Sequence, residues 1–171
     1  FSIQFFSLGS SIKKYSFEER KSLILSFSWW EPTLNKNLIK YIRLAKVIWV
    51  WVVEIQTNWT MLFKNKNYIL DLIGAWLNEI FLAQHSNDTI INNNIWSFYD
   101  LNLFKDWVKF ILDNNINNKV SIYLNIVVTS INIFWLYNYI DFLVKIWFIK
   151  IIPIRHHSNW KITSKISFWF V

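Results

Sequence analysis

Residues 120–140 read VSIYLNIVVTSINIFWLYNYI, a run of 21 residues without a single charge. At a helical rise of about 1.5 Å per residue, this length matches the hydrocarbon thickness of a bilayer. Its tyrosines and its one tryptophan are residue types enriched at membrane interfaces. Apolar character continues past Asp141 and Lys145 to about residue 153. The pattern predicts a transmembrane helix within residues 120–153; the alternative is a buried helix in a large soluble complex.

The charges around this run suggest how such a span would end. Asp141 and Lys145 have the i,i+4 spacing of an ion pair on one helix face, and we interpret them as the end of the span rather than as a proton path. A basic flank follows this run. Basic residues tend to stay on the side of the membrane where the chain is synthesised, so the flank predicts that the C-terminus lies on that side. This flank comprises Lys150, Arg155, Lys161 and Lys165.

A second apolar segment covers residues 47–63, with Glu54 as its only charge. The β-branched and aromatic stretch at its start fits a buried strand as well as a helix. The segment is short for a bilayer, and a carboxylate in its middle makes spanning costlier. A second membrane segment, with Glu54 as a candidate intramembrane charge, therefore remains an alternative.

Helical periodicity is found elsewhere in the chain. It predicts a short helix over residues 16–27 and amphipathic helices over 68–84 and 102–113, with Trp76 and Trp107 on their apolar faces. Asparagine runs, which compete with regular structure, separate these elements. We find no internal repeat of 20–50 residues.

The C-terminal residues 158–171 alternate between apolar and polar types, with Trp160 on the apolar side. A period of two predicts a half-buried strand. The expected fold is therefore mainly α: a helical region over 1–119, a membrane helix within 120–153, and a basic, aromatic tail over 154–171 ending in a short strand. The tryptophans expected to pack are Trp76, Trp107, Trp135 and Trp160.

The composition carries a second signal. The chain has 27 Ile, 19 Asn and 15 Lys but only 3 Ala, 2 Gly and 2 Pro, as expected for an AT-rich gene. Its 12 Trp contradict that bias unless TGA also encodes tryptophan. In this the chain resembles the divergent mitochondrially encoded proteins of protists of ciliate type; an AT-rich reduced bacterium or parasite is the alternative source. The resemblance is one of composition and implies no functional residue.

Few chemistries find their usual residues in this sequence. The absence of cysteine excludes disulfides and Cys-ligated metals. Adjacent His156 and His157 would point to opposite faces of an extended segment, so we expect no metal or cofactor there. With Gly9 and Gly74 isolated, there is no glycine-rich phosphate loop. We expect a chain that is not an enzyme.

The resemblance and the apolar runs together imply a structural subunit of a respiratory complex or of ATP synthase in the mitochondrial inner membrane. Its expected partners are other subunits and membrane lipid, and aromatic packing would stabilise the assembly. The net charge of +7 leaves a mitochondrial ribosomal protein of the matrix, bound to ribosomal RNA, as the alternative.

Overall fold

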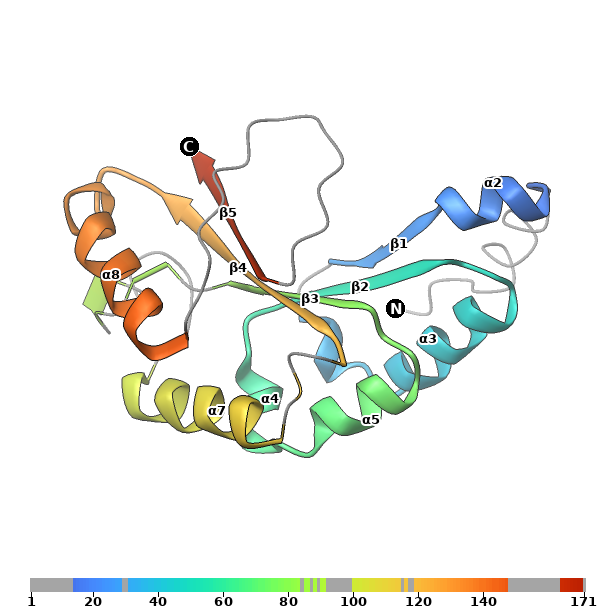
Figure 1. Ribbon diagram of the computed structural model, residues 1–171, viewed down its shortest axis with the longest axis horizontal. Coiled ribbons are helices and arrows are strands. Elements are labelled where there is room, and N and C mark those ends of the chain that lie inside the picture. The colour runs from blue at the N-terminus through green and yellow to red at the C-terminus, as the bar shows by residue number, and fades with distance from the viewer. Residues whose placement is uncertain are drawn as a thin grey trace.

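The computed structural model describes residues 14–28, 31–83, 85–86, 88, 90–91, 100–114, 116, 119–147 and 164–170. This part of the chain is an α/β fold with a five-stranded parallel sheet of order β1-β2-β3-β4-β5 (Figure 1). The strands are β1 (Ile24–Phe27), β2 (Val52–Thr57), β3 (Glu79–Ala83), β4 (Ser121–Val128) and β5 (Ser164–Phe170). The helices are α2 (Phe17–Ser22), η1 (Pro32–Leu34), α3 (Leu38–Val47), α4 (Thr60–Lys64), α5 (Tyr68–Gly74), α7 (Leu101–Asp113), η3 (Ile133–Trp135) and α8 (Leu136–Trp147).

The strand order equals the chain order, and this places the connecting helices together. Crossovers between parallel strands are right-handed, so successive crossovers in one direction fall on the same face of the sheet. Figure 1 shows α3, α4, α5 and α7 along that face. Burial along β2 alternates accordingly: Val53, Ile55 and Thr57 are buried, whereas Glu54 and Gln56, on the opposite face, are only half-buried.

The core between sheet and helices is built around aromatic rings. Trp59, which follows β2, is 1% exposed and donates a 3.0 Å hydrogen bond from Nε1 to the carbonyl oxygen of Ala83. Its ring centroid lies 4.7 Å from that of Trp107 and 5.1 Å from that of Phe104, both on α7. These edge-to-face contacts pack α7 against the sheet near the carboxyl ends of β2 and β3.

The expected transmembrane helix within 120–153 is wrong. Residues 121–128 form β4, which lies between β3 and β5 in the sheet, and the chain then turns through η3 into α8. No helix in the described residues is long and apolar enough to cross a membrane. Strand β4 is largely apolar, with Ile122, Tyr123 and Leu124 buried in succession, and such an apolar run cannot be told from a buried helix by periodicity.

The mainly-α prediction is wrong elsewhere in the chain as well. Residues 47–63 hold the end of α3, strand β2 and α4 rather than a membrane segment. The helix predicted over 68–84 ends at Gly74, and its second half is β3; the helix predicted over 16–27 ends at Ser22 and is followed by β1. The amphipathic helix at 102–113 is confirmed as α7, and a C-terminal strand is confirmed as β5.

Candidate docking site at the tryptophan edge

Two helices end in the same backbone turn, each with a tryptophan at the position where glycine is usual. After α3, the Val50 N–H donates to the carbonyl oxygen of Ala45 (3.0 Å) and the Trp49 N–H to that of Lys46 (3.0 Å). After α5, the Leu77 N–H donates to Leu72 O (3.1 Å) and the Trp76 N–H to Ile73 O (2.8 Å). Both are Schellman motifs, which need a left-handed residue directly after the helix cap.

The backbone of both tryptophans is left-handed, with φ of 68° at Trp49 and 67° at Trp76. For a residue with a Cβ this conformation costs roughly 1–2 kcal/mol, and glycine would avoid that cost. Strain of this kind clusters at functional sites. The core residue Trp59 also has a left-handed backbone (φ 71°), so exposure is what distinguishes Trp49 and Trp76. Each of these turns leads into a strand, so the same helix–turn–strand arrangement occurs twice in succession.

The turn directs both indoles outward. Trp49 is 60% exposed and Trp76 64% exposed, and Trp51, at the start of β2, is 64% exposed. These three side chains lie at the amino end of the strands, and we call them the tryptophan edge. Trp49 has one aromatic neighbour in α2, Phe17, whose ring centroid lies 5.4 Å away. Most of the surface of the three indoles nevertheless faces solvent.

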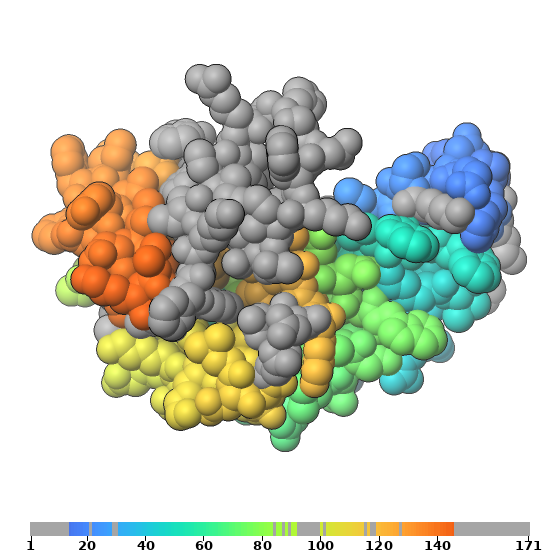
Figure 2. Space-filling view, viewed as in Figure 1, coloured from blue at the N-terminus to red at the C-terminus, as the bar shows by residue number. Residues whose placement is uncertain are grey.

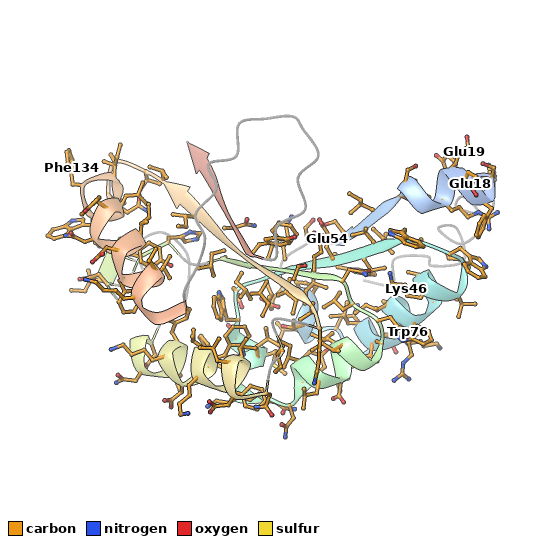
Figure 3. All side chains as sticks on the ribbon, in the orientation of Figure 1. Glu18, Glu19, Lys46, Glu54, Trp76 and Phe134 are labelled. Carbon is orange, nitrogen blue, oxygen red and sulfur yellow. The ribbon has the colours of Figure 1, made fainter. Side chains whose placement is uncertain are left out.

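Between the tryptophans lies a hollow of about 570 Å³. Figure 3 labels two of its residues, Lys46 and Trp76, at the same end of the molecule. No acidic residue contributes to the wall. The lining residues are Lys46, Trp49, Val50, Trp51, Ile73, Trp76, Leu77, Asn78 and Lys119.

Lys46 supports the shape of this hollow from within. Its Nζ donates to the carbonyl oxygens of Trp51 (2.6 Å) and Val50 (3.3 Å) and to Asn78 Oδ1 (2.5 Å). The same Asn78 oxygen accepts the Val53 N–H at 2.8 Å, which ties the start of β2 to the start of β3. Burial lowers the pKa of Lys46. The ammonium therefore fixes the turns that present Trp51, while the more exposed Lys119 leaves a positive charge at the rim.

The carboxyl ends of the strands, where parallel sheets usually bind ligands, hold a different polar cluster. The buried carboxylate of Glu31 accepts the Thr57 hydroxyl (2.6 Å), the Asn58 N–H (2.6 Å), the Thr33 N–H (3.1 Å) and the Thr33 hydroxyl. Four donors engage its two oxygens and join the loop after β1 to the end of β2. This arrangement secures a loop, and we assign it a structural role.

The charged residues singled out by sequence are dispersed in the structure. Glu54 lies on the sheet face opposite the helices (Figure 3), in register with Ser26 of β1 and Glu79 of β3. Asp141 and Lys145 do pair, at 2.6 Å on the exposed side of α8, and this contact raises the pKa of Lys145. Of the basic flank, Lys165 is part of β5, while Lys150, Arg155 and Lys161 lie outside the described residues.

The four tryptophans that the sequence predicted to pack also lie in different environments. Trp107 is fully buried on α7. Trp76 is instead an exposed residue of a turn, and Trp135 is 55% exposed in η3; Trp160 lies outside the described residues. Sequence reasoning missed Trp49 and Trp51 as exposed residues. A left-handed turn is signalled in sequence by glycine or asparagine, and neither stands at position 49 or 76.

In the part of the chain that the structure describes, no group of three or more His, Asp or Glu side chains is suited to hold a metal ion. Comparison of the chain with known protein families and with curated protein sequences finds no match. The tryptophan edge is therefore the feature on which a functional argument can rest.

Proposed function

We propose that this chain is a non-catalytic structural subunit of a mitochondrial oxidative-phosphorylation complex, and that the tryptophan edge docks it onto a neighbouring protein subunit. The observation that carries the proposal is the pair of tryptophans held exposed in strained left-handed turns. Tryptophan is the residue most enriched among those that dominate binding energy at protein interfaces. Three indoles around one hollow offer a partner a pocket and its aromatic walls at once.

The surroundings of the edge favour a protein over a nucleic acid as the partner. Binding RNA requires several cations that meet phosphates. Of the two lysines in the lining, Lys46 is already engaged by three oxygens of the chain itself, which leaves Lys119. A protein segment with an apolar anchor and a carboxylate near Lys119 would match both the aromatic walls and the charge at the rim.

A ribosomal subunit that contacts RNA is the second candidate. The observation in its favour is the exposure of the indole faces, on which bases can stack, in a chain of net charge +7. The two candidates differ in whether RNA is needed for assembly.

The test is sedimentation of the tagged full chain from mitochondria of the organism that encodes it. The wild type is expected to sediment with an assembly many times its own mass of 20.8 kDa, and treatment with ribonuclease should leave it there. The double variant Trp49→Gly/Trp76→Gly should stay at the top of the gradient. A matched control, Ile24→Ser/Leu34→Ser, removes two equally exposed apolar side chains elsewhere and should sediment as the wild type does.

Three results would count against the proposal. Release of the wild type by ribonuclease would favour the ribosomal candidate. Sedimentation of the wild type as a monomer would remove the assembly altogether. Retention of the double glycine variant in the assembly would show that docking does not use the tryptophan edge.

A further inference from the structure

A second apolar surface lies at the other end of the strands, where β4 turns into α8. Phe134 is 87% exposed there and Tyr137 81%, values far above those of most apolar residues in the chain. We call this surface the aromatic tip. It consists of Ile131, Ile133, Phe134, Trp135 and Tyr137.

The aromatic tip projects from the body of the protein. Figure 2 shows the orange residues of η3 and α8 forming one end of the molecule, and Figure 3 places Phe134 at its outer margin. Trp76, of the tryptophan edge, lies toward the opposite end. The two surfaces are thus separate, because one follows the carboxyl end of a strand and the other precedes the amino ends.

The turn beneath the aromatic tip is preformed. Asn132 is 1% exposed; its Nδ2 donates to the carbonyl oxygen of His85 at 3.0 Å, and its Oδ1 accepts the Thr129 N–H at 2.8 Å. The Ile133 N–H donates to Thr129 O (3.0 Å) and the Trp135 N–H to Asn132 O (3.0 Å). Backbone donors satisfied within the turn can enter an apolar medium without the cost of leaving a hydrogen bond unmade.

The chemistry of the aromatic tip matches a lipid interface. No charged residue occurs between Lys119 and Asp141. Tryptophan and tyrosine combine an apolar body with a polar end and are enriched at the level of lipid headgroups. The Asp141–Lys145 pair comes one turn or more after Tyr137, with both side chains exposed, where water or headgroups can solvate it. A net charge of +7 adds attraction to anionic lipid.

We propose that the aromatic tip inserts into the interfacial region of a lipid bilayer and anchors the chain peripherally, without a membrane span. An inserted surface of this kind lies about 5–10 Å deep, at the boundary of headgroups and acyl chains. The occupant we assign to the tip is therefore lipid. This inference does not depend on docking at the tryptophan edge.

The experiment is flotation of the full-length chain with large unilamellar vesicles, some of phosphatidylcholine alone and some with one quarter phosphatidylglycerol. The wild type should float with both, more strongly with the anionic lipid. Phe134→Ser/Tyr137→Ser should reduce partitioning on both vesicle types by about tenfold or more, since two large apolar side chains lose their burial. The matched control Leu34→Ser, which changes a 63% exposed leucine in η1, should float as the wild type does.

A second measurement reports insertion directly. Lipids brominated near the headgroup quench an indole that lies beside them, so vesicles containing them should quench part of the wild-type tryptophan fluorescence. Trp135→Phe should remove most of that quenched component without preventing flotation. Equal thermal unfolding midpoints would show that each variant is folded.

Three outcomes would overturn the proposal. The first is a wild type that floats with neither vesicle. The second is flotation that requires anionic lipid, disappears at high salt and ignores the Phe134→Ser/Tyr137→Ser change, which would be adsorption by basic side chains. The third is a tip that binds a protein partner but leaves Trp135 unquenched by lipid.

Discussion

Replacing Trp76 by glycine and, separately, by alanine isolates the backbone strain at the tryptophan edge. Both variants lose the same indole, so the difference between them reports the backbone and not the side chain. At φ 67°, alanine retains the left-handed cost of roughly 1–2 kcal/mol, and glycine removes it. Glycine also lowers the free energy of unfolding by roughly 0.4–1 kcal/mol, because the unfolded chain has more conformational freedom with glycine than with alanine. The glycine variant should therefore be more stable than the alanine variant by about 1 kcal/mol.

The matched control uses an ordinary helical position. Leu44 is 38% exposed within α3, and there glycine should be less stable than alanine by about 1 kcal/mol. The free energy of unfolding is thus expected to be higher for glycine than for alanine at Trp76, and lower for glycine than for alanine at Leu44. Urea unfolding followed by far-ultraviolet circular dichroism measures all four free energies of unfolding, with equal denaturant dependence required within each pair.

Space around the turn does not interfere with this comparison. Trp76 is exposed, so neither substitution creates an enclosed cavity. If Trp76→Ala proved as stable as Trp76→Gly or more so, the turn would not be left-handed, and the argument that strain is retained there for docking would fail. The same pair at Trp49 should repeat the result, because the two Schellman motifs have the same hydrogen bonds.

Three further predictions concern the interior. Glu31→Ala should destabilise the chain by about 3 kcal/mol in chemical denaturation, because it leaves several buried donors without their acceptor; Glu31→Gln, which keeps one oxygen, should cost less, and equal costs would refute the assigned role. Burial lowers the pKa of His85 from 6.5 to about 4, so the unfolded chain takes up a proton at higher pH than the folded one does. Stability should therefore fall as pH decreases from 6.5 toward 4, by up to about 3 kcal/mol, and His85→Gln should flatten that part of the measured pH profile. Trp107→Ala should cost about 3–5 kcal/mol in the same unfolding assay, whereas Trp135→Ala, on the exposed tip, should change stability by about 0.5 kcal/mol or less; similar losses would contradict the burial difference.

Sequence patterns predicted the elements in which apolar and polar residues are clearly separated. The spacing of Phe104, Trp107 and Ile111 follows a helical face, and these residues are fully buried on α7. Alternation in the C-terminal residues predicted the strand that the structure has as β5. In both cases one face is polar, so the period of the apolar residues is visible in the sequence.

Strand β4 lacks that contrast. In β4, Ile122, Leu124 and Ile126 are buried toward the helices, and Tyr123 between them is buried as well. A strand buried on both faces shows no period of two, and a 21-residue uncharged run then resembles a membrane helix. The sequence also did not reveal where β4 ends and the following helix begins. Asn132 holds the turn after β4 by its side-chain hydrogen bonds, yet in a chain with 19 asparagines its presence carries little information.

The candidate site was hidden for a related reason. A turn made with tryptophan gives up the glycine signal and some stability, and under the proposed docking the contact with a partner subunit offsets that loss. The fold itself sets the positions of the two exposed surfaces. In a parallel sheet all strands have their amino ends on one side and their carboxyl ends on the other, so the tryptophan edge and the aromatic tip face different directions. A subunit built in this way can meet a protein neighbour at the amino ends of its strands while its aromatic tip lies in lipid.

Losing the aromatic tip should release the chain from vesicles but leave the tryptophan edge able to dock. Losing the tryptophan edge should abolish docking but leave binding to vesicles intact. If either change abolished both activities with the fold intact, the two surfaces would belong to one interface, and the division of roles argued from strand direction would be wrong.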